Sequence, residues 1–231
     1  MIQPTYQDGY LQFGNGGIQI DTVNDFDFAV ITKEVEEVRK DFDKSPDACP
    51  DLIGQLDTSL YLSKSKPVIE RLALKMAREH EQKAGHWHSC KMNFSIEQQK
   101  IIDAREMKGN PVLFLESLWV NFQRRYEYQP IHDHRGIYSF IIFYEIPYLM
   151  KDEIAVSPGK NSSQRKAGVL SFHYVNYEGK IRGLDIPADN NWKKRMILFP
   201  ATLMHSVYPF FSTDKYRITI SGNLAPVYIK E

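Results

Sequence analysis

The stretch Pro130-Ile131-His132-Asp133-His134 places two histidines two positions apart, and His205 follows much later in the chain. A β-strand sends residues i and i+2 to the same face, so His132 and His134 can present both imidazoles to one point while Asp133 turns away. His205 begins a second apolar strand after a proline-containing turn, which is how a distant residue returns to such a pair in an antiparallel barrel. The pattern predicts that three histidines meet.

Three such imidazoles suit a metal ion. Neutral imidazole binds Fe(II), Zn, Ni and Cu, and three protein ligands on one side leave coordination positions open for a substrate and a gas molecule. A histidine among apolar residues is often a hydrogen-bonded core residue, but the strand spacing and a later strand-borne histidine favour a metal site. The histidines His132, His134 and His205 are therefore the predicted ligands of an oxygen-handling enzyme.

Further along the chain, Arg217 and Thr219 alternate with Ile218 and Ile220, which predicts a half-buried strand with both polar residues on one face. A guanidinium grips a carboxylate through two parallel hydrogen bonds, and a hydroxyl two positions away adds a third donor. This pair suits a dicarboxylate co-substrate. An ordinary ion pair on a surface strand is the alternative.

Three runs carry a family resemblance: residues 119–136, 199–210 and 216–223. In this order and spacing they resemble the 2-oxoglutarate/Fe(II)-dependent dioxygenases, above all the small oxygenases common in phage genomes, which are distant relatives of prolyl hydroxylases. The resemblance covers roughly residues 113–226, about half of the chain. It implies a mainly β fold with flanking helices, the double-stranded β-helix, a cupin-like jelly-roll barrel. It also implies Fe(II) and 2-oxoglutarate as cofactors and O₂ as a reactant.

The resemblance also implies roles for single residues. His132 and His205 match the two family histidines, Arg217 matches the basic residue that pairs with the distal carboxylate of 2-oxoglutarate, and Thr219 matches the hydroxyl two positions on. Asn121 is a candidate for contact with the keto acid, with a strand-capping role as the alternative. Kinship with prolyl hydroxylases suggests a peptide or protein side chain as the substrate that is hydroxylated.

One position departs from the family pattern. The usual motif has Asp or Glu two positions after the first histidine, where this chain has His134. Either the site has three histidines or His134 is not a ligand, and Asp133 is a spare carboxylate that would need a β-bulge to turn inward. A carboxylate leaves the metal more electron-rich than a third imidazole does, so the change affects metal choice or reactivity with O₂.

Two other classes of protein remain open. A cupin-like three-histidine protein, either a dioxygenase that needs no keto acid or a non-catalytic binding module, would explain His134. Against it, cupins place a glutamate where Ile137-Tyr138-Ser139 stands here, and Arg217 would have no role. A structural or interaction protein that kept only the barrel would turn over no keto acid.

Composition fits an ordinary enzyme. The chain has 231 residues, 42% of them hydrophobic, with 29 basic and 29 acidic side chains. The balanced charge predicts neither a nucleic-acid surface nor another strongly charged partner. Cys49 and Cys90 make no disulfide framework. No signal peptide and no apolar stretch of membrane-spanning length is visible, so the expected location is the cytoplasm.

We expect a single domain over residues 1–231, with N-terminal strands and supporting helices in 1–111 and the metal-binding jelly roll in 112–231. Helices are predicted at 33–42, 67–84 and 96–107. Strands are predicted at 112–120, 121–130, 137–146, 167–175, 195–200, 205–209 and 216–224. Residues 150–166 are interpreted as an exposed loop or a lid. A second His-x-His, His86 and His88, follows a helix end, where a loop is the favoured interpretation.

Overall fold

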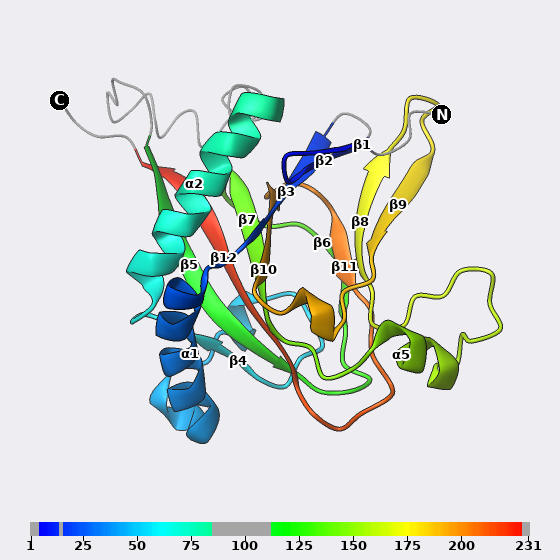
Figure 1. Cartoon of the computed structure of the whole chain (residues 1–231), viewed down its shortest axis with the longest axis horizontal. Coiled ribbons are helices and arrows are strands. Elements are labelled where there is room, and N and C mark those ends of the chain that lie inside the picture. Colours follow the sequence, from blue (N-terminus) through cyan, green and yellow to red (C-terminus); the bar gives the residue numbers. More distant parts are fainter. Residues whose placement is uncertain (1–4, 14–15, 85–111, 228–231) are drawn as a thin grey trace.

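The computed structural model describes residues 5–13, 16–84 and 112–227, which form two antiparallel sheets and the helices that cover them (Figure 1). The strands are, in chain order, β1 (Thr5–Gln7), β2 (Tyr10–Phe13), β3 (Gly16–Thr22), β4 (Ser59–Tyr61), β5 (Val112–Gln123), β6 (Gln129–His132), β7 (Tyr138–Glu145), β8 (Leu170–Val175), β9 (Ile181–Ile186), β10 (Arg195–Pro200), β11 (His205–Val207) and β12 (Arg217–Val227). The helices are α1 (Asp25–Lys40), α2 (Lys66–Ala84) and α5 (Met150–Val156), with short 3-10 turns η1 (Phe42–Lys44), η2 (Cys49–Asp51) and η3 (Asn190–Trp192).

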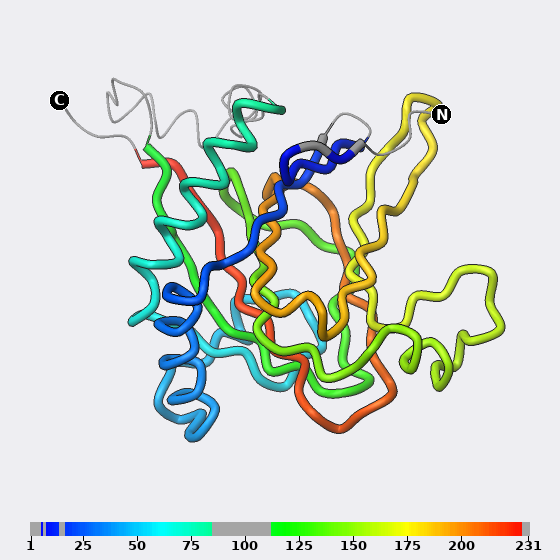
Figure 2. Tube along the Cα trace, in the orientation of Figure 1, coloured from blue at the N-terminus to red at the C-terminus, as the bar shows by residue number. Residues whose placement is uncertain are grey.

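The pairing of the last eight strands defines the fold. β5 pairs with β12, β6 with β11, β7 with β10 and β8 with β9, so the chain folds back on itself as one long nested hairpin. These strands are divided between an eight-stranded sheet, ordered β1-β2-β3-β10-β7-β12-β5-β4, and a four-stranded sheet, ordered β6-β11-β8-β9. From β5 to β12 the chain changes sheet at every step except between β8 and β9, which both lie in the smaller sheet. The chain path is visible in Figure 2. This arrangement is a double-stranded β-helix, the jelly roll, and confirms the predicted fold class.

Helices α1 and α2 lie along the outer face of the larger sheet (Figure 1). Their buried side chains join those of β5 and β12 in one apolar core that includes Val35, Ile69, Met76, Val120 and Ile220. The apolar stripe of α2 recurs every three or four residues, so a single helical face meets the sheet. The predicted helix at 67–84 is thus confirmed almost residue for residue.

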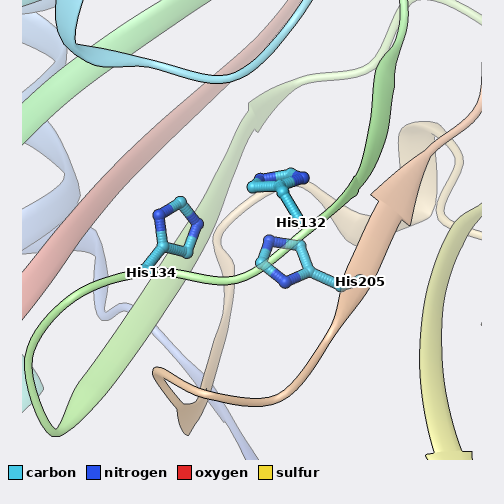
Figure 3. Close-up of side chains that lie close together, drawn as sticks. All are labelled: His132, His134 and His205. Carbon is cyan, nitrogen blue, oxygen red and sulfur yellow. The ribbon is translucent and has the colours of Figure 1, made fainter. Parts of the chain in front are cut away.

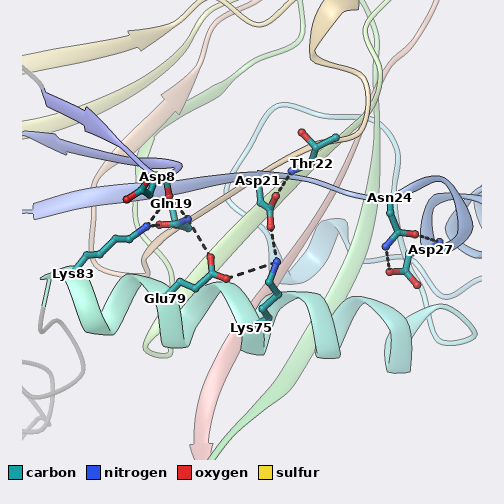
Figure 4. A network of polar contacts seen from close by, with 9 residues as sticks. All are labelled: Asp8, Gln19, Asp21, Thr22, Asn24, Asp27, Lys75, Glu79 and Lys83. Carbon is teal, nitrogen blue, oxygen red and sulfur yellow. Dashed lines mark hydrogen bonds and ion pairs between the residues drawn. The ribbon is translucent and has the colours of Figure 1, made fainter.

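Polar contacts add to this packing where α2 crosses β3 (Figure 4). Lys75 Nζ lies 3.1 Å from a carboxylate oxygen of Asp21, and the Gln19 amide donates to Glu79 over 3.3 Å. Exposed ion pairs contribute little individually. The apolar core therefore supplies most of the stabilisation, while these contacts fix the direction in which α2 runs across the strand.

Helix α1 begins earlier than predicted. The side chain of Asn24 accepts a hydrogen bond from the backbone N–H of Asp27 at 2.9 Å, which caps the helix, and Phe28 and Ile31 are already buried in its first turns. The predicted start at residue 33 is therefore too late, although the capping signal at Asn24 is local and readable in the sequence.

Strand β12 is buried on both faces, whereas a half-buried strand was predicted. It lies between β7 and β5 in the larger sheet. Ile218 and Ile220 pack beneath the helices, and Arg217 and Ser221 are buried on the barrel side. The alternation of residues was correctly interpreted, but its polar face lines the interior of a closed barrel rather than solvent.

Other element boundaries also differ. Strand β5 runs without a break to Gln123, where the prediction divided it at residue 120, and β4 and β9 were not predicted. Helix α5 occupies the start of the supposed loop 150–166, and its buried Glu153 accepts hydrogen bonds from the backbone of Phe211 and Ser212. Four features named from the sequence lie outside the described residues: the predicted helix at 96–107, Cys90, His86 and His88. No helix in the described part of the chain is long and apolar enough to cross a membrane.

Candidate metal centre

His132, His134 and His205 come together at one end of the barrel (Figure 3). His132 is the last residue of β6, His205 is the first of β11, and the two are direct cross-strand partners. The ligand atoms of all three side chains lie within 4.8 Å of one another. The ring centroids are 4.3 Å apart for His132 and His205, and 5.0 Å apart from His134 to each of them.

Backbone carbonyls fix the rings of two of these histidines. His132 Nδ1 lies 2.7 Å from the carbonyl oxygen of Pro130, and His205 Nδ1 lies 3.0 Å from that of Leu203. A carbonyl can only accept, so each Nδ1 must carry the proton and each Nε2 keeps its lone pair. Such a contact sets both the tautomer and the ring direction that a metal ligand needs.

His134 is positioned by a loop, not by a strand. Strand β6 ends at His132, and the backbone N–H of His134 donates to Ala201 over 2.9 Å. Gly136 then turns the chain with φ +98°, where a Cβ atom would lie 2.6 Å from the carbonyl oxygen of Leu224. The expectation that one strand carries both histidines is therefore wrong, although the two imidazoles still converge.

Burial keeps these imidazoles neutral. It lowers the pKa of His134 to about 4, with the neighbouring His132 as the second cause, and it lowers the pKa of His205 well below its usual value. Burial also lowers the pKa of His132, against the opposing effect of its hydrogen bond to Pro130. Neutral imidazole is the form that binds a metal ion, so no proton has to leave first near pH 7.

The donor set fits a divalent metal ion of the first transition row. Three imidazole nitrogens are borderline ligands that suit Fe(II), and metal–nitrogen bonds of about 2.1 Å at right angles would set neighbouring donors about 3 Å apart. In the described part of the chain no carboxylate joins the group, and Asp133 is exposed. The structure thus shows no bulge that turns Asp133 inward.

Arg217 lies inside the barrel and is 5% exposed. Its Nε and Nη2 atoms both donate to Gln123 Oε1, over 3.0 and 2.6 Å. Nη1 donates to the Tyr148 hydroxyl and to the Gly168 carbonyl, each over 3.0 Å. All of these partners are uncharged. Within residues 5–13, 16–84 and 112–227, no carboxylate forms an ion pair with this guanidinium.

Asn121 and Thr219 adjoin the same guanidinium. The Asn121 amide donates to Thr219 Oγ1 over 3.3 Å, and its oxygen accepts from the Ser59 hydroxyl over 2.8 Å. Together with Arg217 they line a cavity of about 30 Å³, room for about two water molecules. The three predicted co-substrate residues are therefore brought to one place, and Asn121 does not cap a strand.

Sequence reasoning missed Gln123 and Tyr148, the side chains that hold Arg217. Gln123 had a readable signal, since it lies two positions after Asn121 on β5 and so shares its face. Tyr148 had none, because it follows β7 in a loop and reaches Arg217 only through barrel closure. Burial raises the pKa of the Tyr148 hydroxyl, against the opposing effect of Arg217, so the hydroxyl is un-ionised.

Three hollows lie in a row along the barrel. The Arg217 cavity shares Gln129, Ile141 and Ser221 with a small space of about 10 Å³ at the imidazoles. That space in turn shares Trp119, Gln129, His132 and His134 with an outer groove of about 780 Å³. The imidazoles therefore lie between the closed cavity that contains Arg217 and the open outer groove.

A family model matches the part of the chain that contains this site. Residues 117–223 match a family model described as "Putative 2OG-Fe(II) oxygenase", a stretch that runs from β5 into β12 and contains the three histidines, Arg217 and Thr219. The match supports a 2-oxoglutarate/Fe(II) oxygenase, the class of enzyme that the sequence motifs indicated. The cofactors of that class are Fe(II) and 2-oxoglutarate. The phage-type part of the resemblance stays a prediction.

Among solved structures, the chain is similar to a Pseudomonas putida prolyl-4-hydroxylase. The TM-score is 0.49 at 10% sequence identity, over 91% of this chain and 92% of that chain. No curated protein matches the sequence.

Proposed function

We propose that this protein hydroxylates a C–H bond of a substrate with O₂, using Fe(II) held by His132, His134 and His205. In this proposal Arg217 and Thr219 hold the distal carboxylate of 2-oxoglutarate, and Asn121 contributes beside them. The observation that carries the proposal is the pairing of a neutral three-imidazole cluster with a buried arginine that has only uncharged partners.

The charge of Arg217 is the strongest argument for an anionic co-substrate. A buried guanidinium without a counter-ion is costly, and hydrogen bonds to neutral groups replace only part of the lost hydration. A carboxylate entering the 30 Å³ cavity restores the missing charge. A purely structural arginine in the same position would more often have an acidic partner.

In this proposal the residues of the site have separate roles that follow from where they lie. His132 and His205 offer fixed Nε2 lone pairs, and ligation from one side leaves positions open for the keto acid and O₂. Ile141, Phe143 and Leu170 line the Arg217 cavity and exclude bulk water. When bound, iron and 2-oxoglutarate supply the oxidation, which couples decarboxylation to succinate and CO₂ with hydroxylation.

The third histidine has a chemical consequence. Three neutral ligands leave the full charge of a divalent ion. The proximal carboxylate of 2-oxoglutarate would balance one unit of it, because the distal carboxylate pairs with Arg217. A cupin-like protein that needs no keto acid is the second candidate, favoured by the lack of a carboxylate in the cluster among the described residues. The buried, uncompensated Arg217 argues for the first candidate.

The cytoplasm, expected from cysteine usage, is the compartment we propose.

The test is a titration of the protein with Fe(II) and 2-oxoglutarate without oxygen, followed by the visible charge-transfer band of chelated keto acid. We expect a band in the wild type, none in His205→Ala and a weaker one in Arg217→Ala. His173→Ala is the matched control, because His173 lies in the neighbouring strand β8 but outside the cluster. Absence of the band at saturating iron and keto acid would overturn the proposal and favour the cupin-like candidate.

A further inference from the structure

The outer groove lies on the side of the imidazoles away from Arg217. His132 and His134 form part of its wall, and Arg217 does not, so a molecule in the groove reaches the metal centre without entering the co-substrate cavity. At about 780 Å³ it is by far the largest of these three hollows. A substrate larger than a small metabolite fits there.

The groove carries more negative than positive charge. Among the described residues, its charged lining side chains are Asp51, Glu116, Asp133 and Arg135, three acids against one base. Glu116 and Asp133 are exposed, and neither makes an ion pair within the part of the chain that the structure describes. Asp51 accepts a hydrogen bond from the Tyr61 hydroxyl at 2.7 Å. Carboxylates without a partner beside a low-dielectric wall attract a cation.

Trp119 supplies an independent indication of a ligand. Its side chain is 3% exposed and lines both the groove and the space at the imidazoles, with its ring centroid 6.0 Å from that of His134. Its buried indole Nε1 has no hydrogen-bond partner among the described residues. An indole N–H is a donor only, and a buried donor without an acceptor is rare and costly. A ligand that brings a hydrogen-bond acceptor to this indole would satisfy it.

The groove wall continues as a polar row on the same face of β5. The Asn223 amide donates to the Ser117 hydroxyl over 3.1 Å, and its oxygen accepts from Ser139 over 2.7 Å. Successive residues of that face, Ser117 and Trp119, thus line one edge of the groove. Such a polar edge suits an extended chain with regularly spaced carbonyl groups better than an apolar molecule.

We propose that the groove binds a peptide segment of a protein that carries a lysine or arginine side chain, and that Trp119 Nε1 donates to one of its backbone carbonyls. Glu116 and Asp133 pair with the positive charge. The inference rests on the proposed function, because it names the substrate class of that same metal centre.

Binding is measured by fluorescence anisotropy on the full chain, with two labelled peptides of glycine and alanine that differ only in two lysines or two glutamates. We expect the lysine peptide to bind at least about tenfold more tightly, and its affinity to fall with added salt. Glu116→Gln and Asp133→Asn should each weaken it about three- to tenfold. Asp152→Asn on α5 removes the same charge outside the groove and should change nothing.

A second comparison separates a peptide from a simple polycation. Trp119→Phe keeps an aromatic ring, smaller than the indole, but removes the N–H. It should weaken binding of the lysine peptide about fivefold while leaving the binding of spermine, which has no carbonyl, unchanged. Equal affinity for the two peptides, or tighter binding of spermine than of the lysine peptide, would overturn the inference. The charge-transfer band is recorded in parallel. If the charge-transfer band appears but the lysine peptide binds no more tightly than the glutamate peptide, only the groove inference is wrong. If the lysine peptide binds more tightly but no band appears, only the proposed oxygenase site is wrong.

Discussion

Gln123 and Arg217 are direct cross-strand partners on β5 and β12, and one Gln123 amide oxygen accepts from both Nε and Nη2 of the guanidinium. The edge of the guanidinium that carries Nε and Nη2 is the one that binds a carboxylate through two parallel hydrogen bonds. Gln123 therefore stands where the distal carboxylate of 2-oxoglutarate would bind. Gln123 also lines the cavity beside Arg217, so we expect this side chain to turn away when the co-substrate binds.

Gln123→Glu should block the co-substrate. A carboxylate at this position would occupy the same edge with a full negative charge, and the buried pair would no longer attract an anion. We expect affinity for 2-oxoglutarate to fall at least about tenfold, measured from the charge-transfer titration. Some thermal stability should also be lost, because the Gln123 amide donates to the Glu127 carbonyl over 2.6 Å and a carboxylate cannot. Gln123→Ala should bind at least as tightly as the wild type. Unchanged affinity in Gln123→Glu would show that the keto acid binds elsewhere.

Thr219→Val tests the hydroxyl beside Arg217. The change is nearly isosteric but removes the acceptor for the Asn121 amide, so we expect a loss of about 1 kcal/mol in unfolding free energy and about fivefold in 2-oxoglutarate affinity. Thr32→Val on α1 is the control, since that hydroxyl donates to the Phe28 carbonyl and does not line the Arg217 cavity. If both variants keep wild-type affinity in the same titration, Thr219 does not contact the co-substrate.

The His134 position tests the three-histidine centre. His134→Leu should lower Fe(II) affinity at least about a hundredfold, because one of three ligands is lost. His134→Asp restores the carboxylate of the usual family motif and should retain Fe(II), measured by anaerobic metal titration. Full Fe(II) affinity in His134→Leu would contradict its role as a ligand.

Glu34 on α1 makes stability depend on pH. It is buried and accepts hydrogen bonds from the backbone of Ser63, Lys64 and Ser65 and from the Ser65 hydroxyl. Burial alone would raise its pKa, but these four bonds outweigh it and the pKa is lowered. Because the folded pKa lies below the unfolded one, the contribution is complete above the unfolded value and disappears as pH falls through the folded value.

Glu34→Gln should therefore cost about 2–3 kcal/mol of unfolding free energy at pH 7, measured by urea denaturation. The difference from the wild type should shrink as the pH is lowered into the acid range. Asp152→Asn, which removes an exposed carboxylate, is the control. A difference that stays constant down to acid pH would show that the ionised form of Glu34 contributes nothing.

Local sequence patterns predicted those helices and strands that depend on residues close together in the chain. The two-residue period and the short apolar runs predicted the strands that deliver His132, His205 and Arg217, and the helical period predicted α2. The same logic missed Asn24 as the start of α1, although its cap was readable.

The sequence by itself determined the set of residues with the chemistry of the site: three histidines, an arginine and a hydroxyl on strands of suitable period. Only the tertiary structure decided that Gln123 occupies the carboxylate edge of Arg217, that a loop rather than a strand positions His134, and that three hollows lie in a row. These features arise where strands far apart in the chain pair in a fixed register and the barrel closes. No local pattern of residues encodes that register.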